Sequence, residues 1–212
     1  MRFENRREAG KRLAEKLDKY RGKKDTIVLG LPKGGVPVAY EIAQRLSLPM
    51  DIVLIKKISH PQSPEFAIGA VGETNKVHLN EYAEQYNISS QYIKAQIELK
   101  KEVIKKLKQL FRNGRDLPCL TGKTIILTDD GVATGATVQT AINILKEEHL
   151  RKFVLALPVS PPDTARKLRK QVDELICLYT PHNFSAVGQF YKQFTQETNE
   201  NVKDMLTKAS NR

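Results

Sequence analysis

The stretch IILTDDGVATGAT, residues 125–137, shows how this chain is built. It begins with a short apolar run rich in isoleucine, which is typical of a strand buried on both faces of a sheet. Two acids, Asp129 and Asp130, end the run, and a loop of small residues follows. A helix is expected to begin at Ala136. The stretch therefore predicts a strand, a turn and a helix in direct succession.

The same alternation recurs along the chain. Apolar strands with helices between them predict an α/β fold with a doubly wound, mainly parallel sheet that is covered on both faces. In such sheets ligands bind outside the carboxyl ends of the strands, so the residues that follow each strand are the candidates for function. The predicted strands are 25–31, 51–58, 123–130, 153–159 and 174–179, and the predicted helices between them are 35–47, 136–148 and 162–171.

The remaining segments predict additions to this core. Residues 67–73 and 76–79 predict a β-hairpin, and residues 60–65, which include two prolines, predict a break in regular structure. Residues 94–112 predict an amphipathic helix that packs an apolar stripe inward. The tail, residues 186–210, predicts a polar helix. We expect one domain over residues 1–212, because neither a linker nor a repeat divides the chain.

The chain is strongly basic, with 35 Lys plus Arg against 24 Asp plus Glu and a formal net charge of +11. Many of these cations lie in two predicted helices, residues 6–21 and 94–112. The charge permits binding to a polyanion. Two interpretations stay open: a plain solvated helix face, or a face that meets an anionic partner or another subunit.

Several classes of protein are excluded. Cys119 and Cys177 are the two cysteines, and they lie far apart without a CxxC, which excludes a disulfide scaffold and a zinc ribbon. No apolar stretch approaches the roughly 20 residues of a membrane span. The first residues lack the apolar core of a signal peptide. The sequence therefore predicts a cytoplasmic protein without a membrane partner.

The loop after the central strand has the chemistry of a sugar-phosphate site. The backbone amides of residues 133–137 open toward a helix N-terminus, and the hydroxyls of Thr134 and Thr137 add donors for a phosphate. Asp129 and Asp130 are placed to accept hydrogen bonds from sugar hydroxyls. The alternative is an ordinary strand-to-helix turn with Asp130 near the cap. The other phosphate-binding patterns, GxxxxGK[ST] and GxGxxG, do not occur in the chain.

A second strand end, Leu31 to Gly35, also suits an anion. Its two glycines, Gly34 and Gly35, expose backbone amides, and Lys33 adds a positive charge. The loop therefore suits pyrophosphate as a ligand. A plain glycine-rich turn with a solvated lysine is the alternative. A third strand end carries Lys56 and Lys57, for which a strand-edge solubility role is the alternative.

Residues 129–137 resemble the 5-phosphoribosyl pyrophosphate (PRPP) motif of type I phosphoribosyltransferases, in which a hydrophobic strand, two acids and small residues precede Thr-Gly-x-Thr. Residues 30–38 resemble the pyrophosphate loop of the family. Residues 66–73 and 181–191 resemble a less characterised branch of predicted phosphoribosyltransferases. The likeness covers roughly residues 5–200.

The resemblance implies transfer of a 5-phosphoribosyl group from PRPP to an acceptor, with release of pyrophosphate and with Mg²⁺ as the cofactor. Few protein ligands to Mg²⁺ are expected; Asp129 and Asp130 are the candidates. The implied catalytic residues are also Asp129 and Asp130. The implied 5-phosphate site is Ala133, Thr134, Gly135, Ala136 and Thr137, and the implied pyrophosphate site is Lys33, Gly34, Gly35, Lys56 and Lys57.

The acceptor is the least defined part. Some relatives that use 6-oxopurines carry an aspartate where this chain has Ala133, so a 6-oxopurine is disfavoured and the acceptor stays unidentified, a nucleobase being one candidate. In the family a small hood of inserted and terminal segments recognises the acceptor; here residues 158–162 and the tail from about 181 to 212 are candidates. Phe184 is predicted either to stack on a base or to serve as a core or hinge residue.

The resemblance also predicts a closing loop over residues 58–75. We expect residues 59–65 to be mobile without ligand and residues 66–71 to pack as a strand. His60 fits a surface histidine better than a catalytic acid.

Two other functions stay open. One is a PRPP-sensing regulator that binds nucleic acid through its basic face, and the other is a hydrolase or transferase acting on a different phosphorylated sugar. We expect PRPP and a small acceptor as partners, and a homo-oligomer.

Overall fold

The computed structural model describes residues 2–210, with the backbone but not the side chain of Glu65. Met1 and residues 211–212, which the expected domain and tail include, lie outside the described residues. The core is a five-stranded parallel sheet in the order β2-β1-β6-β7-β8, which confirms the predicted doubly wound fold. Its strands are β1 (Thr26–Gly30), β2 (Met50–Ile52), β6 (Thr124–Thr128), β7 (Lys152–Val159) and β8 (Glu174–Tyr179).

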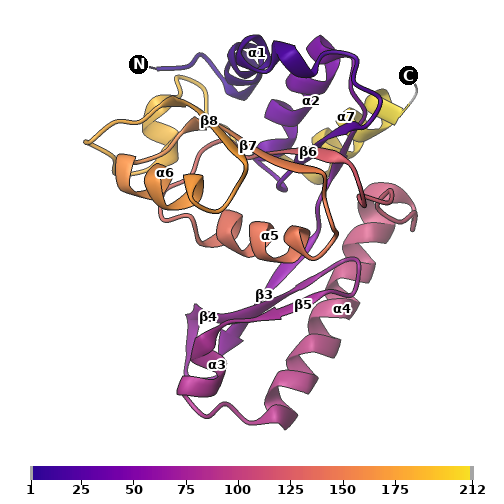
Figure 1. Ribbon diagram of the computed structural model, residues 1–212, viewed down its shortest axis with the longest axis vertical. Helices are drawn as coiled ribbons and strands as arrows, with labels where there is room; N and C mark the ends of the chain where they lie inside the picture. The colour runs from indigo at the N-terminus through magenta and orange to yellow at the C-terminus, as the bar shows by residue number, and fades with distance from the viewer. Residues whose placement is uncertain (1, 211–212) are drawn as a thin grey trace.

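Helices cover both faces of this sheet, because its strands are apolar on both sides. Figure 1 shows α1, α2 and α7 on one face and α5 with α6 on the other. Val28 and Ile126 pack toward Ile42 of α2, whereas their neighbours Ile27 and Ile125 pack with the layer of α5. The helices are α1 (Arg6–Lys16), α2 (Gly35–Leu46), α5 (Ala136–Lys146), α6 (Pro162–Arg169) and α7 (Asn199–Ser210), and a 3-10 turn, η1 (Asp18–Tyr20), follows α1.

The register of the two central strands positions the candidate site. Thr26 pairs with Thr124 and Gly30 pairs with Thr128, so β1 and β6 end at the same level. The amide of Leu31 donates to the Thr128 carbonyl at 3.0 Å, which continues the pairing past the strand end. The glycine-rich loop after β1 and the acids after β6 therefore leave the sheet side by side.

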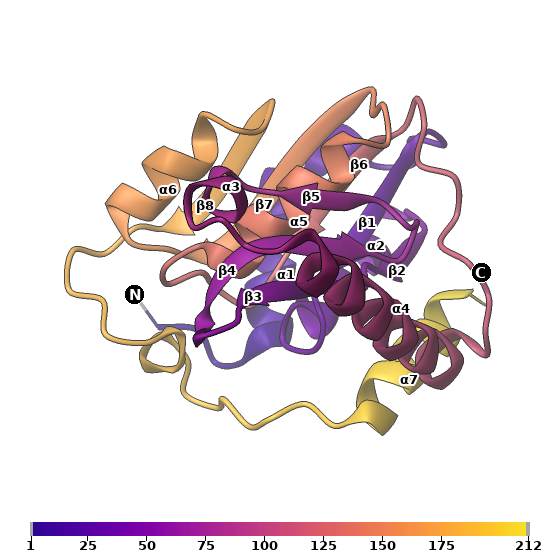
Figure 2. The same ribbon diagram turned by 90° about the horizontal axis from the view of Figure 1, so that it is seen from below.

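A second, antiparallel sheet follows β2 and lies beneath α5 (Figure 1). Figure 2 shows it from below, with α4 alongside its strands. A Cβ added to Gly72 would come within 2.5 Å of the Ile144 side chain, so the end of β4 packs tightly on α5. The elements are β3 (Ile55–His60), β4 (Ser63–Gly72), β5 (Val77–Leu79), α3 (Glu81–Gln85) and α4 (Ser90–Arg112).

This small sheet corrects two sequence predictions and confirms one. The predicted strand 51–58 is two strands, because the chain leaves the central sheet after Ile52 and enters the small sheet at Ile55. The predicted break at residues 60–65 is a hairpin turn between β3 and β4, and Pro64 lies inside β4. Proline is tolerated there because β4 pairs irregularly near the turn. The predicted hairpin of residues 67–73 and 76–79 is confirmed as β4 with β5.

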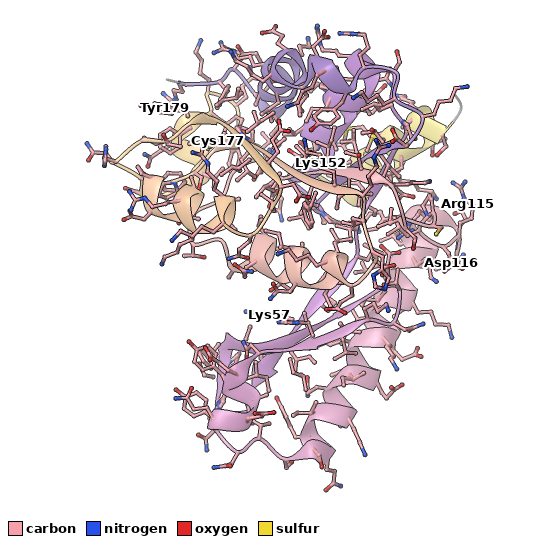
Figure 3. All side chains as sticks on the ribbon, viewed as in Figure 1. Lys57, Arg115, Asp116, Lys152, Cys177 and Tyr179 are labelled. Atoms are coloured by element: carbon pink, nitrogen blue, oxygen red, sulfur yellow. The ribbon has the colours of Figure 1, made fainter. Side chains whose placement is uncertain are left out.

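A buried ion cluster joins the small sheet to the central one. The Arg112 guanidinium donates to the Glu73 carboxylate and lies 3.5 Å from Oδ1 of Asp51 in β2. The amide of Leu54, at the crossing between the two sheets, donates to Glu73 Oε1 at 2.8 Å. Burial raises the pKa of both carboxyl groups, and Arg112 opposes the rise. Arg112, the last residue of the basic helix α4, is therefore a buried connector. In Figure 3 the neighbouring Arg115 and Asp116 lie beside this end of α4.

The N-terminal residues pair with the segment around Tyr191 beside the carboxyl edge of the central sheet. Phe3 bridges Tyr191, its amide donates to the Phe190 carbonyl at 2.7 Å, and its carbonyl accepts from Lys192 at 2.8 Å. The predicted helix 186–210 is wrong in part, since residues 191–198 are not helical and separate the 3-10 turn η2 (Val187–Phe190) from α7. Helix α7 packs against α2 and α4. Among residues 2–210, no helix is long and apolar enough to cross a membrane.

Gly10 allows α1 to lie close to α2. A Cβ at this position would come within 2.8 Å of the Val38 carbonyl oxygen and of the Glu41 Cβ. Gly10→Ala should therefore lower the free energy of unfolding by about 1–3 kcal/mol despite the better helix propensity of alanine. Urea unfolding measures this, with Lys11→Ala on the exposed face of α1 as the control. A variant as stable as wild type would show that α1 can move away at no cost.

Candidate active site

The acids that follow β6 lie where the loop after β1 meets the C-terminal segment. Asp129 and Asp130, from here on the acid pair, are half-buried. The amide of Asp130 donates to Oδ1 of Asp129 at 2.9 Å. The hydroxyl of Tyr191 donates to the backbone carbonyl of Asp130. The acid pair is thus held by its own backbone and by a residue 61 positions further along the chain.

The glycines of the loop after β1 lie directly against the acid pair. A Cβ on Gly34 would come within 2.1 Å of Asp130 Oδ2, and one on Gly35 would lie 2.6 Å from the Thr128 carbonyl oxygen. Only glycine fits at either position. Lys33 is exposed beside them, and the peptide bond between Pro32 and Lys33 is cis. The structure therefore brings the predicted pyrophosphate loop and the predicted ribose-binding acids together.

The loop of residues 133–137 opens to solvent at the start of α5. Gly135 precedes the helix with φ of 86°, a left-handed conformation that glycine adopts without strain. The other four residues of the loop are exposed. The Thr164 hydroxyl donates to the Ala133 carbonyl at 2.8 Å and ties the loop to α6. Exposed backbone at a helix N-terminus is a geometry that accepts phosphate, and phosphate binding here stays a prediction.

The two lysines of β3 are not at the carboxyl edge of the central sheet. Lys56 pairs with Val71 and Lys57 with Ala70, inside the small sheet. Side chains alternate along a strand, so the two lysines point to opposite faces. Figure 3 shows Lys57 on the face turned toward α5. Of the two, Lys57 is therefore the one on the side of the helix that begins at the phosphate loop.

The rings of His60 and Phe184 pack against other aromatic side chains. The His60 ring lies 5.4 Å from that of Tyr86 and 6.1 Å from that of Phe66, which fits the predicted surface histidine. Phe184 is half-buried, and its ring lies 5.0 Å from that of Phe190. This packing favours the core interpretation of Phe184 over stacking on an acceptor.

Arg6 contacts the acid pair, and sequence reasoning missed it. Its Nε donates to Asp130 Oδ2 at 2.8 Å, and its side chain is only 9% exposed. In the sequence Arg6 belongs to a basic helical segment with two open interpretations, a solvated face or a face that meets an anionic partner or another subunit, and nothing in the charge pattern separates it from Arg7. Neither interpretation holds at Arg6, which is buried because the first turn of α1 lies against the end of β6.

Comparison with known proteins identifies the family. Residues 3–195 match the model of the phosphoribosyl transferase domain. The chain belongs to this family. The assignment confirms the resemblance to the phosphoribosyltransferase family.

Individual relatives extend the match over nearly the whole chain. Two Mycobacterium tuberculosis proteins, named "Putative phosphoribosyl transferase MT0597" and "Putative phosphoribosyl transferase Rv0571c", are each 38% identical over 208 residues. The alignments cover 98% of this chain, which spans about half (47%) of the length of those relatives. The crystal structure of TT1426 from Thermus thermophilus is 39% identical, with a TM-score of 0.87 over 98% of this chain and 99% of that one.

In this phosphoribosyl transferase domain, burial and mutual repulsion make it unfavourable to ionise both carboxyl groups of the acid pair. Burial raises the pKa of Asp129 well above its usual value, and the adjacent charge of Asp130 adds to the rise. Burial also raises the pKa of Asp130, while the hydrogen bond and charge of Arg6 act in the opposite direction. Two carboxylates side by side disfavour each other's ionisation. The acid pair therefore holds a proton more readily than an isolated aspartate does.

The carboxylates of the acid pair fit a metal ion that receives most of its ligands from water and substrate. Among residues 2–210 no group of three or more His, Cys, Asp or Glu side chains could hold a metal ion. Carboxylate oxygens are nevertheless present, and a Cβ on Gly35 would lie 3.3 Å from Asp129 Oδ1, so this oxygen borders the glycine loop. Such a site suits Mg²⁺ that keeps most of its water and the substrate oxygens as ligands.

Asp129→Asn should raise the free energy of unfolding of the unliganded protein at neutral pH. An acid whose pKa is higher in the folded than in the unfolded state costs stability once both states are ionised, at about 1.4 kcal/mol per pKa unit. The full increase in the free energy of unfolding is expected above the folded-state pKa of Asp129. The increase should vanish as the pH falls toward the pKa of aspartate in the unfolded chain, about 3.9. Urea unfolding across this pH range measures it.

Asp204→Asn, on the exposed face of α7, is the matched control for this substitution and should change little. Equal stability of Asp129→Asn and wild type at neutral pH would contradict the stated cost of the acid pair.

Proposed function

We propose that this protein transfers a 5-phosphoribosyl group from PRPP to a nucleophilic acceptor and releases pyrophosphate. One observation carries the proposal: the acid pair lies against the glycines of the β1 loop, beside an exposed loop that opens α5. These three parts match the ribose, the pyrophosphate and the 5-phosphate of a single substrate. The membership of residues 3–195 in the phosphoribosyl transferase domain family supports the same conclusion.

Each part has a distinct role in this proposal. The amides of residues 133–137 and the hydroxyls of Thr134 and Thr137 hold the 5-phosphate at the N-terminus of α5. The acid pair accepts hydrogen bonds from the ribose hydroxyls. The amides of Gly34 and Gly35, together with Lys33, hold the pyrophosphate. The Lys57 side chain approaches from the small sheet when that sheet closes over the substrate.

The chemistry is a displacement at C1 of the ribose. The bond from C1 to the pyrophosphate oxygen breaks, and pyrophosphate leaves with the electron pair. The acceptor forms a bond to C1 and releases a proton to solvent. Positive charge develops on the sugar as the leaving group departs, and the acid pair stabilises it at short range. Mg²⁺ bound to the pyrophosphate supplies neutralisation of the leaving group.

The acceptor pocket is proposed to lie under residues 158–162 and 181–191. Ala133 offers no carboxylate at the loop position where 6-oxopurine-using relatives carry one, so another class of nucleophile, such as a different nucleobase or an amine, is favoured. Phe184 packs on Phe190 and is not free to stack on a base without moving. A cytoplasmic location and a homo-oligomeric state stay predictions.

Thr137→Val should weaken PRPP binding about tenfold or more, since it removes one hydroxyl donor to a charged phosphate. Thr140→Val is the matched control: its hydroxyl lies one turn further along α5 and donates to the Ala136 carbonyl at 2.8 Å. Thermal unfolding with PRPP and Mg²⁺ measures binding, because a ligand at 100 times its Kd stabilises the fold by about 2.7 kcal/mol. Pyrophosphate release, tested with nucleobases and amines, identifies the acceptor.

Absence of any stabilisation of wild type by millimolar PRPP and Mg²⁺ would overturn the proposed function. Stabilisation by ribose 5-phosphate, without discrimination in favour of PRPP, would instead indicate a different phosphorylated sugar.

The turn between β3 and β4 should become protected when PRPP binds. The Ser59 hydroxyl donates to the Pro64 carbonyl at 2.8 Å, and the Tyr92 hydroxyl of α4 donates to the Ser59 carbonyl at 2.9 Å. These few bonds to an exposed turn permit local opening. Hydrogen exchange should slow at residues 59–65 on PRPP addition and should stay unchanged at residues 66–71. Equal protection in both states would mean that this turn is fixed and that another segment covers the substrate.

A further inference from the structure

The acid pair poses an electrostatic difficulty for the proposed substrate. Two adjacent, half-buried carboxylates repel each other and repel the phosphate groups of PRPP. Proton uptake by one of them would relieve the repulsion but would remove a hydrogen-bond acceptor for the ribose. The site therefore needs a positive charge that is fixed in place before the substrate arrives.

Arg6 is the positive charge that contacts the acid pair. Its Nε donates to Asp130 Oδ2 at 2.8 Å, and the side chains of the two residues are 9% and 14% exposed. The contact uses Oδ2, which is also the atom nearest to a Cβ placed on Gly34. One carboxylate oxygen of Asp130 is thus occupied by the protein itself, and Oδ1 is the oxygen left to receive a ribose hydroxyl.

Contacts on several sides hold the Arg6 guanidinium. Its Nη1 donates to the Thr195 carbonyl at 2.7 Å and lies 3.7 Å from Glu197 Oε1. Its Cζ lies 3.9 Å from the centre of the Phe194 ring, which stacks at 5.0 Å on the ring of Tyr191. Tyr191 in turn donates to the Asp130 carbonyl. Arg6 in α1 and Tyr191 after η2 therefore both contact Asp130.

We propose that Arg6 is a positioning residue of this site: by holding Oδ2 of Asp130, it aims the free oxygen Oδ1 at a ribose hydroxyl of PRPP. The inference rests on the proposed function. It makes the first turn of α1 and the segment after η2 parts of the substrate site, and it explains why a cation of a basic helix is buried there. Arg6 acts through Asp130 and does not touch the reacting atoms.

The charged and titratable groups around Asp130 come from five segments. Asp129 adjoins it in the loop after β6, Arg6 approaches from α1, and Tyr191 comes from the segment after η2. Glu197 faces Arg6 from the segment before α7, and Lys33 is exposed in the loop after β1 that borders Asp130. Arg6 holds Asp130 by a direct hydrogen bond, so its removal should let the carboxylate turn away from the ribose.

The test compares Arg6→Met, Arg6→Lys and the control Arg12→Met. Arg12 lies on the same helix, is 41% exposed in its side chain and pairs with Glu8 away from the acid pair. Two readouts are needed. The first is the affinity for PRPP with Mg²⁺. The second is the affinity for pyrophosphate with Mg²⁺, which in the proposed function depends on the glycine loop and Lys33 and not on the ribose acceptors.

Arg6→Met should weaken PRPP binding about tenfold or more, because the Asp130 carboxylate is no longer held toward the ribose. It should leave pyrophosphate binding nearly unchanged. Arg6→Lys should restore part of the PRPP affinity, because it keeps the charge without the fixed fork of the guanidinium. Arg12→Met should change neither affinity.

An unchanged PRPP affinity in Arg6→Met and Arg6→Lys, or an equal loss of PRPP and pyrophosphate affinity, would overturn the role of Arg6 while leaving the proposed function intact. If Arg6→Met does not fold, the comparison of Arg6→Lys with wild type decides the same question. A wild type that fails to bind PRPP would overturn the proposed function itself, together with the positioning role that rests on it.

Discussion

The close approach of the glycine loop to the acid pair is the constraint on which the rest of the site depends. Gly34 lies so near Asp130 that a methyl group would collide with the carboxylate, and Gly35 presses on the backbone of β6 in the same way. This approach requires β1 and β6 to be neighbours that end at one level. The parallel sheet and its register thereby bring the glycine loop and a pair of acids into contact.

Burial of two adjacent carboxylates lowers the free energy of unfolding, as is common at functional sites. The protein offsets part of the cost with the buried Arg6 and with hydrogen bonds to the backbone. A second buried cluster, Arg112 with Glu73 and Asp51, meets the same difficulty at the root of the small sheet. There the charges anchor one sheet to the other, whereas Asp129 keeps a carboxylate beside the glycine loop.

Much of the fold was predictable because its signals are local. Buried parallel strands appear in the sequence as short apolar runs, and residues 125–137 carry a strand, its acids and a helix start in one continuous segment. The small sheet was less predictable. Residues 51–58 form one apolar and basic run in sequence, and only the packing of β3 against β4 and α4 shows that the chain changes sheets near Val53. The prolines near residue 62 did not prevent a hairpin, because the irregular pairing beside the turn accommodates them.

The sequence by itself determined the fold class and the family, and it predicted the residues of a candidate sugar-phosphate site, since each depends on side chains and glycines that are close together in the chain. Only the tertiary structure decided which distant residues contact that candidate site. Arg6 and Tyr191 reach Asp130 across 124 and 61 positions. A contact of this range leaves no periodic signal in the sequence. It arises because α1 packs on the sheet and Phe3 pairs with Tyr191, which brings both segments to the end of β6.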